Sequence, residues 1–268
     1  MIVQPAYAVV AGHIVAAHAA AGRPLVVGLA GSQGSGKSTL AHFLRDDLGR
    51  RGLAAAVVSL DDLYLDRPER VALAARVHPL LATRGVPGTH DVALGMATID
   101  ALLAATADST TAIPRFDKAS DRRGAPDRLA GACDVVILEG WCLGAVAQSD
   151  ADLAPPVNRL EADEDGDGTW RRFVNAALAR DYPPLFARID LMVFLAAPGF
   201  ADVLGWRTRQ ERMLPAGGSA TMDDAALARF IMHYERLTRA MLATMPARAD
   251  IVLRLAPDQS IRAVEIRP

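Results

Sequence analysis

The sequence predicts an α/β fold in which helices cover both faces of a central parallel β-sheet and a further helical segment forms a lid. Apolar runs of strand length alternate with helical patterns along the chain. A glycine-rich loop joins the first apolar run to its helix, and acidic residues follow two later runs. With 268 residues, 51% of them hydrophobic, the chain can bury a sizeable core, and we expect one domain over residues 1–268.

The glycine-rich loop fits the phosphate-binding pattern G-x-x-x-x-G-K-[ST] at every required position. A helical pattern over residues 6–21 and an apolar run over residues 25–30 precede it, and a helix over residues 37–50 follows. This order of strand, loop and helix predicts a P-loop. The residues expected to bind the nucleotide are Gly31, Ser32, Gln33, Gly34, Ser35, Gly36, Lys37, Ser38 and Thr39.

The chemistry of such a loop follows from its backbone. Glycines let the main-chain N–H groups point inward, and the helix N-terminus adds partial positive charge, so that a polyphosphate is bound mainly by backbone donors. Lys37 is expected to reach the β- and γ-phosphates and so to act in catalysis, and Ser38 to place its hydroxyl on Mg²⁺.

Acids follow the second and third apolar runs. Residues 54–60 lead to Asp61 and Asp62, which point to opposite faces if the strand continues through them. One of the two is then expected to face the γ-phosphate and Mg²⁺, while the other could simply cap the next turn. The third strand is expected over residues 133–141, and its apolar part leads to Glu139, which matches the acidic second signature of P-loop enzymes. Asp61 and Glu139 are therefore alternative direct ligands for Mg²⁺, together with Ser38.

Two loops are candidates for the acceptor site. After a helix over residues 69–83, a turn-rich segment brings Arg84, His90 and Asp91 close together, and Asp91 can cap a helix over residues 92–107. A short strand near residue 113 then ends in alternating charge at Arg115 and Lys118. Composition alone equally allows the first loop to be a plain surface turn and the second a solvated charged face.

The C-terminal half continues the alternation of predicted helices and strands. We expect an irregular insertion over residues 145–168, a helix over 170–180, a strand over 185–197, a helix over 222–244 and a last strand over 249–255. The helix over residues 199–214 carries Arg207 and Arg209, which we favour as catalytic lid residues over ordinary surface charge, because a transferring phosphoryl group needs cations. The lid region spans about residues 199–219.

The net charge and the cysteine content limit which partners and which compartment are expected. The net charge of −2 and the pI near 6.3 give no basic excess for a nucleic-acid backbone or an anionic membrane surface. No apolar run is long enough to span a membrane. Cys133 and Cys142 form no CxxC pair, which favours two reduced thiols and a cytoplasmic location. The oligomeric state is left open.

Taken together, the motifs resemble those of plant-type D-glycerate 3-kinases, which are P-loop kinases grouped with the uridine, pantothenate and phosphoribulose kinases. The resemblance extends from the P-loop to the expected lid. Besides the P-loop it rests on SLDDLYL at 59–65, RGVPGTHD at 84–91, IPRFDK at 113–118, LEGWCLG at 138–144 and GWRTRQE at 205–211.

This resemblance implies ATP and Mg²⁺ as cofactors and a small hydroxy acid as the phosphoryl acceptor. By analogy, Asp61 takes the proton from the attacking hydroxyl. Because guanidinium binds carboxylate in a fork, Arg115 is the first candidate for the acid group of the substrate and Lys118 the second. The other residues assigned to the acceptor side are Asp62, Tyr64, His90, Asp91 and Asp117.

Two other functions stay open at this point. The same chemistry could act on a nucleoside, a pantothenate-like compound or a sugar phosphate, although the 5% aromatic content mildly disfavours a stacking pocket. A nucleotide-binding regulator without an acceptor is the third possibility, but it would have no use for two acceptor loops.

Overall fold

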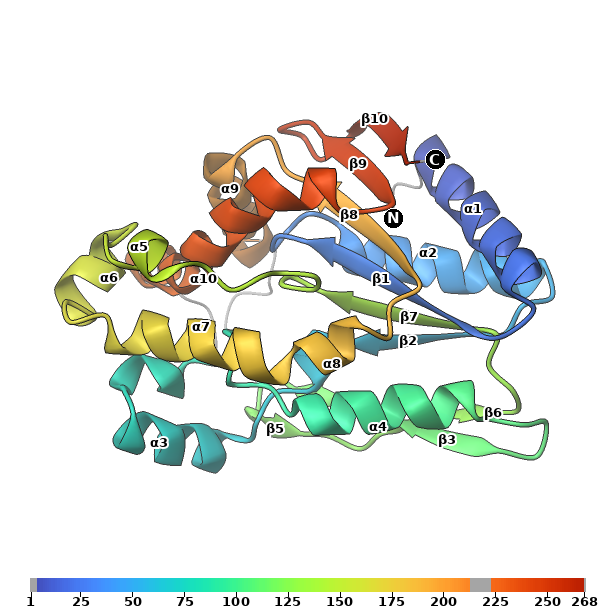
Figure 1. Cartoon of the computed structure of the whole chain (residues 1–268), viewed down its shortest axis with the longest axis horizontal. Coiled ribbons are helices and arrows are strands. Elements are labelled where there is room, and N and C mark those ends of the chain that lie inside the picture. Colours follow the sequence, from blue (N-terminus) through green and yellow to red (C-terminus); the bar gives the residue numbers. More distant parts are fainter. Residues whose placement is uncertain (1–3, 213–222, 268) are drawn as a thin grey trace.

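A mostly parallel sheet forms the centre of the computed structural model, which describes residues 4–212 and 223–267. Its strand order is β10-β9-β8-β1-β7-β2, and neighbouring strands run parallel except β10, which is antiparallel to β9 (Figure 1). The strands are β1 (Leu25–Gly31), β2 (Ala55–Ser59), β7 (Val135–Gly140), β8 (Leu191–Ala196), β9 (Ile251–Leu255) and β10 (Ile261–Ile266). The predicted α/β class is confirmed.

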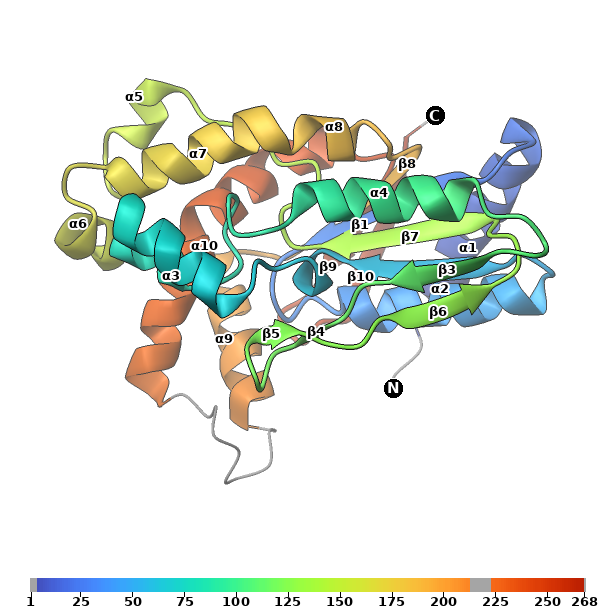
Figure 2. The same cartoon turned by 90° about the horizontal axis from the view of Figure 1, so that it is seen from below.

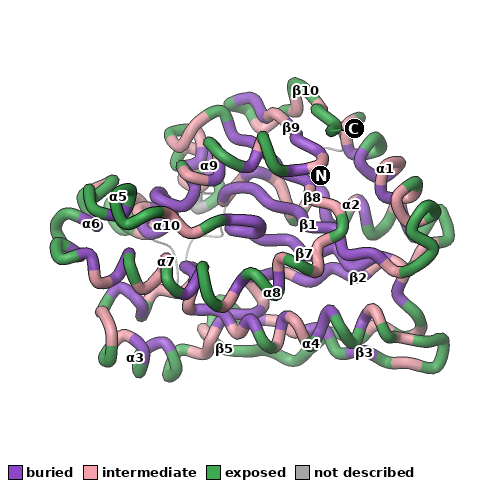
Figure 3. The backbone as a smooth tube through the Cα atoms, in the orientation of Figure 1, coloured by how far each residue is buried: buried purple, intermediate pink, exposed green. Residues whose placement is uncertain are grey.

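Helices cover both faces of this sheet. They are α1 (Pro5–Ala21), α2 (Lys37–Arg50), α4 (Val92–Leu103), α7 (Thr169–Asp181), α8 (Pro183–Phe186) and α10 (Asp224–Thr244). Val27 and Leu29 of β1 pack in one core with α1 and α2, whereas Val26 and Ala30 pack in another with α4, α8 and α10. Buried residues therefore gather along β1 and β7 (Figure 3), which explains their uninterrupted apolar sequences.

Shorter elements connect these layers. β3 pairs with β6 and β4 with β5 as two small antiparallel ladders (Figure 2), and β3 contacts α4. These elements are η1 (Leu60–Asp62), α3 (Arg67–Arg76), η2 (Pro79–Ala82), β3 (Thr110–Ile113), β4 (Phe116–Asp117), β5 (Arg122–Arg123), β6 (Asp127–Ala130), α5 (Asp150–Leu153), α6 (Arg159–Glu164), α9 (Phe200–Arg212) and η3 (Met245–Ala247).

Four segments differ from the prediction. The helix expected over residues 69–83 ends at Arg76 of α3, and the separate turn η2 starts at Pro79, because proline cannot continue an α-helix. Residues 145–168 are not wholly irregular, because they contain α5 and α6, each capped by a polar side chain at its N-terminus. The strand expected over residues 185–197 is shorter, because α8, which starts with two prolines, occupies its beginning. β10 was missed, since it is an edge strand with mostly exposed residues.

Two further expectations concern the lid and membranes. α9 lies in the predicted lid region, of which residues 213–219 are outside the described part of the chain. Within the residues described, every helix is too short or too polar to cross a bilayer.

Candidate active site

The carboxyl ends of β1, β7 and β2 bring the predicted donor residues together. Glu139 of β7 lies opposite Leu29 of β1 and opposite Ser59 of β2, so the P-loop, Glu139 and the turn after β2 share one edge of the sheet. They open onto a cleft of about 720 Å³. The predicted site residues that line this cleft are Gln33, Gly34, Lys37, Ser38, Asp61, Tyr64, Lys118, Glu139 and Arg207.

The P-loop has the geometry expected of a phosphate cradle. Gly34 and Gly36 have φ values of 75° and 92°, which side-chain-bearing residues rarely adopt. The hydroxyls of Ser32 and Ser35 are buried without a hydrogen-bond partner in the protein. Because unpaired buried polar atoms are costly, they favour a polar ligand in the loop, such as a polyphosphate. Of the other predicted residues, Gly31 ends β1 and Thr39 lies in the first turn of α2.

Lys37 and α9 border this loop from two sides. The Lys37 ammonium donates a hydrogen bond to the Ser32 carbonyl at 2.9 Å, and burial lowers its pKa despite the nearby Glu139. A Cβ on Gly34 would lie 2.8 Å from the Cβ of Trp206 in α9. The glycine is therefore needed both for the loop conformation and for the close approach of the predicted lid helix.

Glu139 is held beside Ser38. Its Oε1 accepts hydrogen bonds from the Ser59 hydroxyl at 2.6 Å and from the Ser38 hydroxyl at 3.4 Å, and the side chain is buried. A hydroxyl and a carboxylate side by side fit Mg²⁺, which prefers oxygen ligands. Among the described residues no group of three or more His, Cys, Asp or Glu side chains could hold a metal.

Asp61 lines the same cleft as the P-loop and forms a cluster with Lys118 and Tyr64. Its carboxylate accepts hydrogen bonds from the Lys118 ammonium and the Tyr64 hydroxyl, both at 2.6 Å. Burial raises the pKa of Asp61, but the charge and hydrogen bond of Lys118 and the Tyr64 hydroxyl outweigh it and lower the pKa to about 2. Asp61 is consequently ionised throughout the physiological range and holds Lys118 in the cleft.

Asp62 bonds different partners from Asp61. This difference does not come from neighbouring positions on an extended strand, as the sequence suggested. Both acids lie on the η1 turn rather than on an extended strand. The Asp62 carboxylate accepts hydrogen bonds from the Phe116 N–H at 2.9 Å and from Arg115 at 2.8 Å, and Arg115 also pairs with Asp127. Asp62 and Arg115 thus fasten the β4 loop, and neither lines the cleft in the described structure.

The remaining acceptor candidates also lie outside the cleft lining. His90 is buried, stacks on the Tyr64 ring at 5.1 Å and hydrogen-bonds the Tyr182 hydroxyl, so it supports Tyr64 from behind. Burial lowers the pKa of His90 to about 4, which keeps it neutral. Asp91 caps α4, as expected, and pairs with Arg123. Asp117 is exposed and bonds within its own turn.

The two arginines of the predicted lid, Arg207 and Arg209, have different surroundings. Arg207 lines the cleft, whereas Arg209 donates to the Pro257 carbonyl at 3.3 Å, on the turn between β9 and β10. The Trp206 indole donates to the same carbonyl at 2.7 Å. Of the two arginines, Arg207 therefore faces the cleft from α9, where Gln210 also lines it.

Several lining residues were not assigned a role from the sequence. Arg70 lies on α3, Arg84 follows η2, Asp121 lies between β4 and β5, and Tyr234 comes from α10. Arg84 belongs to the motif at residues 84–91, but the sequence around it gave no reason to prefer it to Arg115 as a ligand for the substrate. The others carry no short-range signal, because only the tertiary fold brings them to the cleft.

Comparisons with known proteins agree with this geometry. A family model described as "Methylmalonyl Co-A mutase-associated GTPase MeaB" matches residues 4–63, the segment that contains the P-loop. The chain is 35% identical over 224 residues to "Uncharacterized kinase mug58" of Schizosaccharomyces pombe, covering 80% of this chain and 79% of that protein.

Two relatives carry a more specific name. The chain is 30% identical over 236 residues to "D-glycerate 3-kinase, chloroplastic" of Arabidopsis thaliana, covering 84% of this chain but only 49% of the plant protein. The solved structure of D-glycerate 3-kinase from Cryptococcus neoformans superposes with a TM-score of 0.82 at 26% identity, covering 99% of this chain and 100% of the fungal one. The chain belongs to the family of ATP-dependent P-loop kinases that contains these fungal and plant proteins named D-glycerate 3-kinase.

Proposed function

We propose that this kinase transfers the γ-phosphoryl group of ATP to a hydroxyl of D-glycerate. The observation that carries the proposal is the shared cleft, in which the P-loop faces the cluster of Asp61, Tyr64 and Lys118. A regulator that only switches with nucleotide needs no such second cluster. The names of the plant and fungal relatives supply the identity of the acceptor.

In the donor half, the main-chain N–H groups of the P-loop and the Lys37 ammonium bind the phosphates of ATP. Ser38 and Glu139 would hold Mg²⁺, since their oxygens lie next to each other at the end of β7. A bound Mg²⁺ would neutralise charge on the β- and γ-phosphates. Asp61 is engaged by Lys118 and Tyr64, which favours Glu139 over Asp61 as the direct ligand.

In the acceptor half, Asp61 orients the attacking hydroxyl and accepts its proton. Its low pKa makes it a weak base, so orientation of the hydroxyl accounts for most of its effect, as in other phosphoryl transfers. Lys118 lies beside it, where a cation stabilises negative charge on the transferring group. Arg207 would add positive charge from α9.

We further propose that the enzyme works in the cytoplasm as a kinase of a small hydroxy acid. Its two cysteines are free and buried, which suits a reducing compartment. The names of the plant and fungal relatives favour this acid over a nucleoside, pantothenate-like or sugar-phosphate acceptor. The aromatic residues Tyr64, Trp141, Phe230 and Tyr234 also line the described cleft.

A coupled assay of ADP release with Mg²⁺ and ATP tests the proposal. Separate reactions contain D-glycerate, uridine, pantothenate, ribulose 5-phosphate or no acceptor. We expect D-glycerate to raise the rate well above the acceptor-free rate and to give the highest kcat/KM of the panel. A rate that no acceptor changes would instead indicate a regulator, and a higher kcat/KM for another compound would reassign the substrate.

A further inference from the structure

We propose that Arg84 binds the carboxylate of the acceptor and so determines the specificity of the cleft for an acid. The proposal rests on the proposed function, since it assigns the residue that recognises the acid group of D-glycerate. Arg84 takes the place of Arg115, the first candidate from the sequence, because the Arg115 guanidinium already donates hydrogen bonds to Asp62 and Asp127.

Two arginines share one carboxylate at this place. Asp121 accepts a hydrogen bond from Arg70 at 2.5 Å and another from Arg84 at 2.6 Å. Arg70 is only 2% exposed, and its guanidinium also donates to the carbonyls of Leu65 and Ala82. Arg70, Arg84 and Asp121 together therefore carry a net charge of one positive unit. Because Arg70 is buried, the guanidinium of Arg84 is the cation of this group that is accessible from the cleft.

The guanidinium of Arg84 has capacity for a ligand. Within the described part of the chain, Nη1 is the only atom of its guanidinium with a hydrogen-bond partner, and the side chain is 28% exposed at the cleft wall. The remaining N–H groups can therefore bind a carboxylate, for which the planar fork of guanidinium is well matched. A substrate carboxylate would give each of the two arginines an acidic partner.

The position of Arg84 relative to Asp61 fits a short hydroxy acid. The Arg84 guanidinium lies 5.9 Å from the centre of the Tyr64 ring, and the hydroxyl of the same ring donates to Asp61. Segments 63–65 and 89–91 are joined by backbone hydrogen bonds, which fixes the Arg84 loop beside Tyr64. Asp61 and Arg84 both line the cleft, so a small molecule bound there can place a hydroxyl at Asp61 and a carboxylate at Arg84.

The backbone of Arg84 is held rigidly. Its carbonyl accepts a hydrogen bond from the Tyr234 hydroxyl at 2.8 Å, and the carbonyl of Gly85 accepts one from the Trp141 indole, also at 2.8 Å. Gly85 has φ of 116°, and a Cβ there would lie 2.4 Å from the Tyr234 oxygen. Only glycine allows this close contact, and the pinned loop reduces the entropy lost when a ligand binds.

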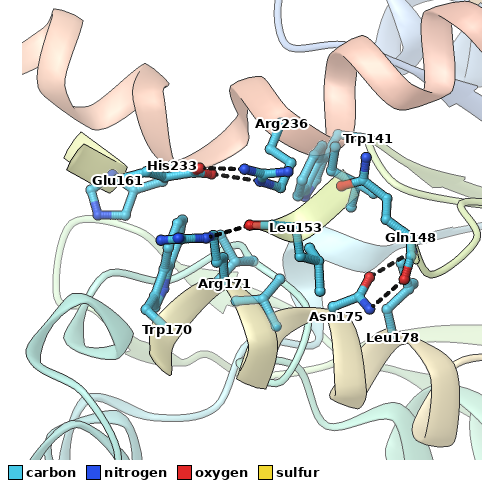
Figure 4. A pocket seen from close by; sticks show the side chains of 13 residues that line it. Trp141, Gln148, Leu153, Glu161, Trp170, Arg171, Asn175, Leu178, His233 and Arg236 are labelled. Carbon is cyan, nitrogen blue, oxygen red and sulfur yellow. Dashed lines mark hydrogen bonds and ion pairs between the residues drawn. The ribbon is translucent and has the colours of Figure 1, made fainter. Parts of the chain in front are cut away.

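Trp141 in turn is backed by a second cavity between α7 and α10 (Figure 4). Around it Arg236 forms two hydrogen bonds to Glu161, and Arg171 donates to the Leu153 carbonyl, as the dashed lines show. These buried cations are fully engaged within the protein, so they stabilise the wall behind Trp141 and leave ligand binding to the cleft side.

The test compares D-glycerate with glycerol, which keeps the hydroxyls and lacks the carboxylate. We expect Arg84→Ala to lower kcat/KM for D-glycerate about 100-fold, mainly through a higher KM, because a charge-assisted pair is lost. The rate with glycerol should change little, and Arg84→Lys should restore part of the loss. Arg188→Ala is the matched control, since Arg188 is also 28% exposed and ion-paired but does not line the cleft.

The outcomes separate the two proposals. If the wild-type enzyme turns over D-glycerate and Arg84→Ala keeps the same preference for it over glycerol, the assignment of Arg84 is overturned while the proposed function stands. If the wild-type enzyme does not turn over D-glycerate, both fail. Should Arg84→Ala not fold, arginine modification of the wild-type enzyme by phenylglyoxal decides: D-glycerate but not glycerol should protect Arg84, and equal modification in both would contradict the proposal.

Discussion

At the scale of single residues, we propose that the charge of Asp61 is needed to position the acceptor. Lys118 and Tyr64 both hydrogen-bond its carboxylate, and the pKa near 2 keeps it ionised. The lowered pKa also means that the interaction stabilises the folded protein above about pH 3.8, the usual pKa of an aspartate, and is lost as the pH falls towards 2.

We predict that Asp61→Asn lowers kcat by roughly 10² to 10⁴-fold, the range expected for loss of a positioned carboxylate base. ATP binding should be retained, because the P-loop does not contact Asp61 through any hydrogen bond in the described structure. Stopped assays of product formation and equilibrium binding of an ATP analogue measure the two effects. Full turnover by Asp61→Asn would exclude Asp61 as the base.

Lys118 gives a second prediction at this scale. Without its ammonium the pKa of Asp61 must rise, because burial then acts with less opposition. In Lys118→Ala the acidic limb of the profile of kcat/KM against pH should therefore move to higher pH than in the wild-type enzyme. An unchanged acidic limb would show that Asp61 does not control it.

At the scale of elements, the turn after β2 fastens the β4 loop that carries Lys118. The contact consists of Asp62 with the Phe116 N–H and with Arg115. Arg115 has a second partner, Asp127, whose side chain is 65% exposed. The two aspartates therefore contact the same guanidinium from environments of different burial, and they form a natural pair for comparison.

We predict that Asp62→Ala destabilises the protein by about 1–3 kcal/mol, since it leaves a partly buried donor without its acceptor. It should also raise the KM for the acceptor, because Lys118 is less well positioned. Asp127→Ala should change the unfolding free energy by less than about 1 kcal/mol, as is usual for exposed ion pairs. Urea unfolding and steady-state kinetics measure both variants. Equal effects of the two substitutions would contradict this account.

The elements also show what local sequence can predict. β1, the P-loop, α2 and β7 were predicted nearly residue for residue, because their apolar runs and glycine spacing are local features. The hydrogen bonds between Asp62 and Arg115 were not predicted, since residue type and motif do not reveal which carboxylate a guanidinium will pair with. Arg70, Asp121 and Tyr234 reach the cleft only through the tertiary fold, and no pattern in the sequence reports that.

At the scale of the whole molecule, two buried histidines couple stability to pH. Burial lowers the pKa of both His90 and His233 to about 4. In the unfolded chain histidine has a pKa near 6.5. Between these values the unfolded state binds more protons than the folded state, so the unfolding free energy falls as the pH decreases from about 6.5 to about 4.

We predict that lowering the pH from 7 to 5 reduces the unfolding free energy by roughly 2 kcal/mol for each of these histidines, measured by urea unfolding. His233→Leu should remove about half of this pH-dependent loss. The matched control, His13→Gln, alters a partly exposed side chain outside the core and should leave the pH-dependent loss unchanged. A loss that His233→Leu does not reduce would place the pH dependence elsewhere.

For the molecule as a whole, we propose that one cleft binds both ATP and the hydroxy acid, so that the phosphoryl group passes directly between them. The most direct measurement is transfer of label from [γ-³²P]ATP with D-glycerate present, with the products separated and identified. The account predicts labelled phosphoglycerate from the wild-type enzyme and a loss of at least about 100-fold in Lys37→Ala. Release of labelled inorganic phosphate alone, at a rate independent of D-glycerate, would contradict it.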